Sequence, residues 1–272
     1  MDEMKINTHL ASRELFRSGN ALLVLLALVK FLLHAATNLA GGYGYFRDEF
    51  YYIACSDHLA WGYVDHPPWS IAILWISRFL FGDTLFAIRL LPAIAGAAVV
   101  ALAGLITREL GGRRFAQVVA AASVIVAPLT LGMNSYFSMN SFDMFFWTLA
   151  IYLIAIILKN DSQKNWLLLG AVLGLGLLNK ISVLWLGAGL LVGFLATSNR
   201  RLLLAPRVWL AGVVALLLFL PYMLWQVAND FPTLEFIRNA TANKYSAVSP
   251  LEMVIQQSLS MNPTTFLIWC RG

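Results

Sequence analysis

The sequence predicts an all-α integral membrane protein, a multi-span helical bundle of about seven to eight transmembrane helices. Hydrophobic residues make up 60% of the 272 residues and charged residues 12%, with a mean hydropathy of +0.72. A soluble domain usually has about 25% charged residues. Apolar runs near the length of about 20 residues that a helix needs to cross a bilayer recur along the whole chain. A single soluble domain is therefore excluded.

The apolar runs define the predicted elements in chain order. The predicted spans are residues 21–40, 86–107, 115–131, 144–158, 166–178, 181–197 and 208–227. Residues 69–81 form a shorter run, which we expect to lie as a helix at the membrane interface. A further run begins after Asn262 and Pro263 but stops within ten residues, at Gly272. This pattern predicts a chain that is truncated within an eighth span.

Charges in the connecting segments predict an orientation. Basic residues occupy the N-terminal segment and every second loop: Lys5, Arg13, Arg17, Arg108, Arg113, Arg114, Lys159, Lys164, Arg200, Arg201 and Arg207. Most of the acidic residues fall in the opposite segments. The positive-inside rule then predicts a cytoplasmic segment 1–20, a first outer loop 41–68 and a later outer loop 228–250. We expect one transmembrane domain over residues 1–272, multi-pass in the cytoplasmic (inner) membrane, with the first loop periplasmic.

The remaining composition is consistent with this class. The net charge of +5 is spread over short loops rather than over a basic, aromatic stripe, so no nucleic-acid partner is expected. Cys55 and Cys270 show no pairing pattern and are interpreted as unpaired thiols. The first apolar run is long for a cleaved signal peptide, so a retained helix is favoured.

The first outer loop gathers polar groups of the kinds used in chemistry. Asp48 and Glu49 are adjacent and follow the first span, and Asp65 precedes His66 and a double proline that stiffens the return to the membrane. A carboxylate there can act as a general base. It can also hold a divalent cation that neutralises a phosphate leaving group. The plain alternative is a solvated acidic loop.

Four segments together resemble a known family. RDEFYYIACSDHLAWGYVDHPPW, FGDTLFAIRLLPAIAG, NSYFSMNSFDMFFWTLA and GLGLLNKIS occur in this order. In combination they resemble the polytopic C-type glycosyltransferases, nearest the bacterial protein-mannosyltransferase and aminoarabinose-transferase branch. The resemblance covers roughly residues 21–263.

The resemblance implies a function and a site. Members transfer a sugar from a polyprenyl-phosphate-linked donor to a lipid, protein or glycan acceptor on the outer face of the membrane. Their acidic catalytic motif falls here on Asp48 and Glu49, with Asp48 as the base or metal ligand, and a second acidic group falls on Asp65. His66 stands where the aminoarabinose branch often has a lysine, so the sugar is left open. Asp48 and Asp65 are candidate ligands for a divalent cation, and no other cofactor is expected.

Four further residues are candidates with a plain alternative each. Lys180 either holds the donor phosphate or extends its ammonium to the interface. Arg89 either contacts phosphate or pairs with Asp83 at a helix end. Lys244 lies in an outer segment that either closes over the donor or is a solvated connector. Asp143 is interpreted as a helix cap, or alternatively as a cavity-lining group. His66 completes the predicted donor-binding set.

Two other functions stay open. A transporter or flippase of lipid-linked sugars would place polar groups near the bilayer midplane, where Lys30 and His34 lie one helical turn apart. The truncation also allows an inactive fragment whose motif residues record ancestry. The clustering of charges in the first outer loop favours the enzyme.

Overall fold

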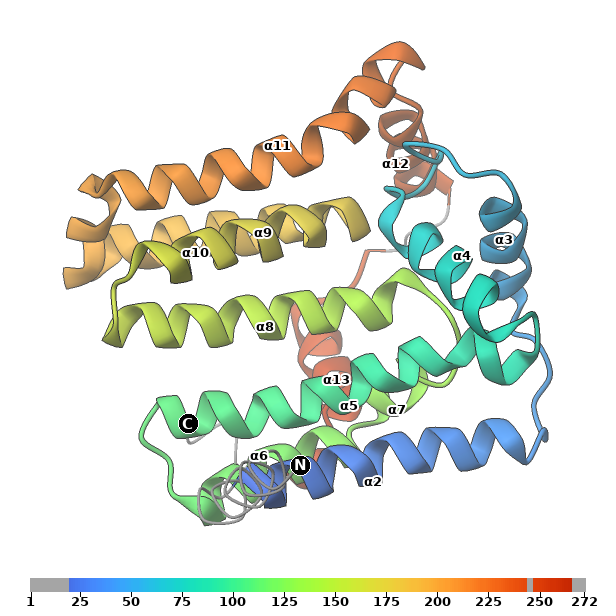
Figure 1. The fold of residues 1–272 in the computed structure, drawn as a ribbon, viewed down its shortest axis with the longest axis horizontal. Helices are drawn as coiled ribbons and strands as arrows, with labels where there is room; N and C mark the ends of the chain where they lie inside the picture. Colours follow the sequence, from blue (N-terminus) through green and yellow to red (C-terminus); the bar gives the residue numbers. More distant parts are fainter. Residues whose placement is uncertain (1–19, 244–246, 266–272) are drawn as a thin grey trace, which may run out of the picture.

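The computed structural model describes residues 20–243 and 247–265. All regular structure in these two ranges is helical (Figure 1). The α-helices are α2 (Asn20–Leu39), α3 (Arg47–Asp57), α4 (Trp69–Phe81), α5 (Leu85–Glu109), α6 (Arg114–Val126), α7 (Pro128–Met133), α8 (Met139–Lys159), α9 (Gln163–Asn179), α10 (Val183–Ala196), α11 (Pro206–Ala228), α12 (Pro232–Asn243) and α13 (Pro250–Ser260). Two 3-10 helices, η1 (Ser198–Leu204) and η2 (Pro263–Thr265), complete the set.

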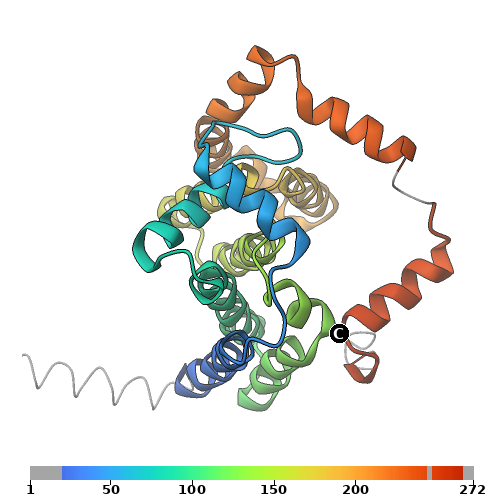
Figure 2. The same ribbon diagram turned by 90° about the vertical axis from the view of Figure 1, so that its right-hand side faces the viewer.

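The long helices lie side by side, and two short helices lie across one end of them. Figure 1 shows α2, α5, α8, α9 and α11 running in roughly the same direction, with α3 and α4 at the right-hand end. Figure 2 looks onto that end and shows α3 in front of the bundle. We call it the α3–α4 end. Pro67 and Pro68 lead into α4, and Gly82, with a φ of 81°, ends it. The predicted interfacial helix 69–81 coincides with α4 in its bounds.

Membrane-spanning character is clearest in four helices. α2, α5, α8 and α11 are long and apolar enough to cross a bilayer, and α10 with η1 adds a fifth span if that pair, bent by 116°, is counted as one. α9 has 17 residues and α6 has 13. The predicted class, an all-α membrane bundle, is confirmed. Among the residues that the structure describes, four to five spans meet these criteria, whereas seven to eight are predicted for the chain.

The predicted span 115–131 is wrong as a single helix. α6 ends at Val126, Ala127 is extended (φ −67°, ψ 122°), and Pro128 begins α7. Proline lacks an N–H and disfavours a helical conformation in the preceding residue, so the helix breaks there. The Lys30 ammonium, on the fully buried face of α2, lies 3.5 Å from the Ile125 carbonyl oxygen and 3.2 Å from Thr130 Oγ1. Lys30 thus donates hydrogen bonds to polar groups on both sides of the break.

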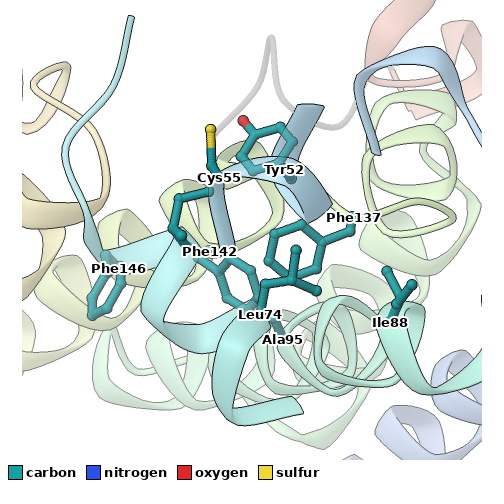
Figure 3. Close-up of a cluster of buried hydrophobic side chains, with 9 residues drawn as sticks. Tyr52, Cys55, Leu74, Ile88, Ala95, Phe137, Phe142 and Phe146 are labelled. Carbon is teal, nitrogen blue, oxygen red and sulfur yellow. The ribbon is translucent and has the colours of Figure 1, made fainter. Parts of the chain in front are cut away.

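The hydrophobic core joins α3 and α4 to the bundle. Figure 3 shows Tyr52 and Cys55 from α3 above Leu74 of α4, Ile88 and Ala95 of α5, Phe142 of α8, and Phe137 just before α8; Phe146 of α8 belongs to the same cluster. Phe137, Leu74 and Ile88 are at most 1% exposed. The α3–α4 end is therefore a packed layer rather than a loosely attached loop. Cys55 is a buried free thiol, as expected, whereas Cys270 lies outside the described residues.

Candidate active site

Glu49 is the most constrained carboxylate at the α3–α4 end. Its side chain is fully buried, and Arg89 Nε and Nη2 donate to its two oxygens at 2.8 and 2.7 Å. The backbone N–H groups of Phe46 and Phe137 donate to the same carboxylate, each at 2.8 Å. Arg89 also donates to the Gly44 carbonyl at 2.8 Å. Glu49 thus ties together the loop before α3, helix α5 and the segment before α8.

This pairing corrects the expectation for Arg89. The predicted partner Asp83 pairs instead with Arg78, while Arg89 pairs with Glu49 and is 3% exposed. A bidentate arginine–carboxylate pair with further backbone donors leaves little capacity for a ligand. The geometry therefore occupies both side chains with each other and with backbone groups.

Asp48 has a different environment although it is adjacent in sequence. Its side chain is 48% exposed, and among the described residues its ion-pair partner is the exposed Arg47 guanidinium, at 3.2 Å. Burial raises the pKa of Tyr136, and the negative charge of Asp48 adds to that rise. Burial raises the pKa of Tyr52 as well, with further contributions from Asp65 and Asp48. Asp48 and Asp65 therefore both contribute to the raised pKa of Tyr52.

Asp65 is held by a tyrosine that the sequence did not single out. The Tyr51 hydroxyl donates to Asp65 Oδ1 at 2.6 Å, and His66 Nε2 lies 3.8 Å from the same oxygen. His66 is 1% exposed, and its ring stacks on Tyr52 with centroids 5.2 Å apart. Burial lowers the pKa of His66, against the opposing effect of Asp65. His66 therefore favours the neutral form and is a poor fixed charge for a phosphate.

Lys180 forms a second polar cluster, at the turn between α9 and α10. Its ammonium donates to Asn140 Oδ1 at 2.8 Å and lies 3.5 Å from Asp143 Oδ2. The Ser182 hydroxyl donates to Asp143 at 3.0 Å. The interpretation of Asp143 as a helix cap is wrong, because Ser138 is the N-cap of α8. Asn140 and Asp143 are three residues apart, so they share one face of α8.

A cavity of about 600 Å³ brings Asp65 and Lys180 to one space. Its other lining residues are mostly apolar, and half of the lining comes from α10 and α12. The lining residues are Asp65, Pro67, Met139, Lys180, Ile181, Ser182, Leu184, Trp185, Ala188, Thr233, Phe236 and Ile237. Asp48, Glu49, His66 and Arg89 are not among these residues. Lys244, the remaining predicted donor-binding residue, lies outside the described residues.

A second cavity, of about 410 Å³, lies on the other side of the same proline turn. Pro67 lines the first cavity, and Pro68 and Trp69 line the second. The second cavity is walled by apolar side chains, among them Leu59, Trp61 and Leu178. Gly62 in this loop packs so closely on Trp225 of α11 that a Cβ atom would lie 2.3 Å from its ring. The loop between α3 and α4 thus packs against α11.

The carboxylates fit a metal ion only in part. In the described ranges no three His, Cys, Asp or Glu residues gather where they could hold an ion. Mg²⁺ is commonly held by one or two carboxylates together with substrate phosphates. Asp48 and Asp65 therefore suffice as protein ligands only for an ion that shares its coordination with a bound phosphate.

Comparisons with known proteins agree on one kind of protein. The family model described as dolichyl-phosphate-mannose-protein mannosyltransferase matches residues 65–225. The undecaprenyl phosphate-alpha-4-amino-4-deoxy-L-arabinose arabinosyl transferase of Pseudomonas aeruginosa (strain UCBPP-PA14) is 29% identical over 162 residues, which cover 58% of this chain and 24% of that relative. The crystal structure of ArnT from Cupriavidus metallidurans in the apo state aligns with a TM-score of 0.66 and 20% identity. That alignment covers 90% of this chain and 49% of ArnT. The chain spans about half of the solved relative and a quarter of the curated one.

Proposed function

The chain belongs to the dolichyl-phosphate-mannose-protein mannosyltransferase family, and from this premise we propose that it is a membrane glycosyltransferase with a polyprenyl-phosphate-linked sugar as donor. The sugar is transferred to a hydroxyl group of a lipid, protein or glycan acceptor on the outer face of the cytoplasmic membrane. The relative named as acting with an undecaprenyl phosphate-linked arabinose supports a lipid-linked donor of this class.

The observation that carries the proposal is the cavity shared by Lys180 and Asp65. A polyprenyl phosphate has one anionic head on a long apolar chain. Lys180 supplies a compact positive charge for the head. Leu184, Trp185 and Phe236 line the same cavity and supply apolar surface for the chain. Burial of apolar area contributes roughly 25 cal/mol per Å², so several prenyl units suffice for firm binding.

Asp48 and Asp65 have different roles in the proposed reaction. Asp48 accepts the proton of the acceptor hydroxyl, since its carboxylate is 48% exposed and its ion-pair partner within the described ranges is the exposed Arg47. The acceptor oxygen forms a bond to the anomeric carbon while the bond from that carbon to the phosphate oxygen breaks. Polyprenyl phosphate leaves with the electron pair, opposite the attacking oxygen, so the anomeric configuration inverts. Asp65, oriented by Tyr51, accepts from a sugar hydroxyl. A divalent cation shared by Asp48 or Asp65 and the phosphate would neutralise the leaving group.

The test uses membranes that contain this chain and a panel of radiolabelled polyprenyl-phosphate sugars. Label transfer to endogenous lipid and protein is followed for the native chain and for Asp48→Asn. We expect the variant to lose transfer by at least about 100-fold, the contribution typical of a general base. The matched control is Asp230→Asn, because Asp230 is exposed with a φ of 59°, a conformation that asparagine adopts well. Unchanged transfer by Asp48→Asn would rule out Asp48 as the general base. No transfer by the inserted native chain would contradict the glycosyltransferase function and favour a flippase or an inactive fragment.

Lys180 is tested separately from the chemistry. Lys180→Gln should raise the donor KM about tenfold or more with a smaller change in kcat, because the contact with phosphate is made before and during reaction. Lys180→Arg retains the charge and should keep most of the affinity. An equal loss of kcat in both variants with unchanged KM would contradict a donor-binding role.

A further inference from the structure

A polar hollow lies at the α3–α4 end, separate from the cavity that Asp65 and Lys180 line. It measures about 330 Å³ and is lined by Ser56, Asp57, Trp75, Arg78, Phe79 and Asp83. None of these residues lines the cavity that contains Asp65 and Lys180. The proposed reaction therefore makes no use of this hollow.

Arg78 is the central group of the hollow. Its Nη1 donates to Asp57 Oδ1 and to the Ser56 hydroxyl, both at 2.6 Å, and its Nε donates to Asp83. Within the described ranges its Nη2 has no such partner. Two N–H donors of the guanidinium are thus available for an anionic ligand.

The two carboxylates outnumber the one guanidinium. The side chains of Asp57 and Asp83 are 54% and 70% exposed, and each has Arg78 as its ion-pair partner. The hollow therefore carries a net charge of about −1 with free carboxylate oxygens beside free guanidinium donors. Such a pattern is complementary to a group that has both a positive and a negative charge.

Two exposed aromatic side chains beside the hollow are consistent with a place at the membrane–water interface. The rings of Trp75 and Phe79 are stacked, with centroids 5.7 Å apart and planes at 11°, and both are exposed. They lie on α4, which crosses the ends of the spanning helices and borders the bundle in Figure 2. Exposed tryptophan and phenylalanine on a helix of this kind are typical of the membrane–water interface.

We propose that this hollow binds the headgroup of a zwitterionic phospholipid of the ethanolamine type. The lipid phosphate accepts from Arg78 Nη2. The ethanolamine ammonium donates to Asp57 and Asp83 and lies near the face of Trp75, where a cation is attracted by the ring. An anionic lipid without an amine would face two carboxylates and gain one contact only. The binding is independent of the glycosyl transfer proposed above.

The alternative is that Arg78 only clamps α3 to α4 while Trp75 and Phe79 anchor the helix in lipid. That role predicts no selectivity among headgroups. The two roles therefore differ in a measurable ratio of retained lipids.

The test reconstitutes the purified chain in nanodiscs with equal parts of phosphatidylethanolamine, phosphatidylcholine and phosphatidylglycerol, and measures retained lipids by native mass spectrometry. We expect phosphatidylethanolamine to be enriched about fivefold, a size typical of exposed charge-assisted contacts. Equal retention of the three lipids would overturn the proposal. So would equal enrichment of phosphatidylcholine, whose methylated amine donates no hydrogen bond.

Variants separate binding from loss of structure. Arg78→Gln should abolish the enrichment. Asp57→Asn with Asp83→Asn should reverse it in favour of phosphatidylglycerol, because an uncompensated Arg78 then remains. The control is Arg200→Gln, since Arg200 is an exposed arginine in η1, which joins α10 to α11 at the end of the bundle away from α3 and α4. Unchanged preference in the double aspartate variant, with an unaltered melting temperature, would contradict the proposed contacts.

Discussion

At the scale of residues, the pair of Glu49 and Arg89 is buried, so the loss of one partner should be costly. Glu49→Gln leaves the Arg89 guanidinium buried without a charge partner, and removal of one member of a buried pair costs about 3–5 kcal/mol. We expect that loss in the free energy of unfolding, measured by denaturation in detergent. Lys159→Gln is the control. Lys159 pairs with Glu109, and their side chains are 54% and 19% exposed, respectively, so this ion pair contributes at most about 1 kcal/mol.

A double variant tests the cause of that loss. Arg89→Met added to Glu49→Gln removes the unpaired charge, so most of the lost stability should return. A single variant that costs less than about 1 kcal/mol would show that the pair is not a determinant of the fold.

His66 predicts an acid-dependent loss of stability. Its pKa is lowered in the folded state by burial, so the unfolded chain binds more protons once the pH falls below the ordinary histidine pKa of about 6.5. Stability is therefore full above that pH and declines as the pH falls further toward the folded-state pKa. Melting temperatures at pH 7.5 and pH 5.5 measure the effect, and His66→Phe should reduce the difference between them. A difference as large in the variant as in the native chain would assign the pH dependence to other groups.

At the scale of elements, glycine decides how closely α9 and α11 pack. A Cβ on Gly170 would lie 2.4 Å from the Ala211 carbonyl oxygen, which belongs to the backbone of α11 and cannot rotate away. Gly170→Ala should therefore separate the two helices and lower the free energy of unfolding by about 1–3 kcal/mol. Gly187→Ala in α10 meets no atom within 4 Å and should be neutral or slightly stabilising. Equal effects of the two substitutions would argue against tight packing at Gly170.

The α6–α7 break shows what local sequence can and cannot predict. Pro128 marks the break, and its effect on the preceding residue is a local rule, so residues 115–131 were readable as two helices. The contact of Lys30 with Ile125 spans 95 positions and depends on how α2 packs, which no local pattern encodes. The same holds for Arg89, whose partner Glu49 is 40 residues away while Asp83 is near in sequence.

For the whole molecule, the distribution of charge predicts the sidedness of the bundle. In a background with Cys55→Ala and Cys270→Ala, a cysteine at Asp57→Cys should react with a membrane-impermeant maleimide applied from the periplasmic side. A cysteine at Arg200→Cys should react only after permeabilisation, since both ends of the bundle cannot face one compartment. Labelling of Arg200→Cys alone in intact cells would reverse the orientation.

The sequence predicted the class of the whole molecule better than the details of its site. Apolar runs of bilayer length are sufficient to predict the all-α bundle, because the length and composition of each run alone indicate a helix in the membrane. The sequence singles out Asp65 and Lys180, which line one cavity, but not the contact of Tyr51 with Asp65 or the pairing of Lys180 with Asp143. The Tyr51–Asp65 contact joins residues 14 positions apart, and the Lys180–Asp143 pair joins α8 to the end of α9, so only the packed fold brings these residues together.

The contacts of Glu49 also set an order of events during synthesis. Its last partner, the Phe137 amide, lies 88 residues further along the chain. Ribosomes add about 5–20 residues per second, so Glu49 waits roughly 4–18 s after its own translation before that partner exists. Until then the acidic loop lacks its hydrogen bond to the segment before α8. It becomes a rigid layer only when the polypeptide has been translated past α7.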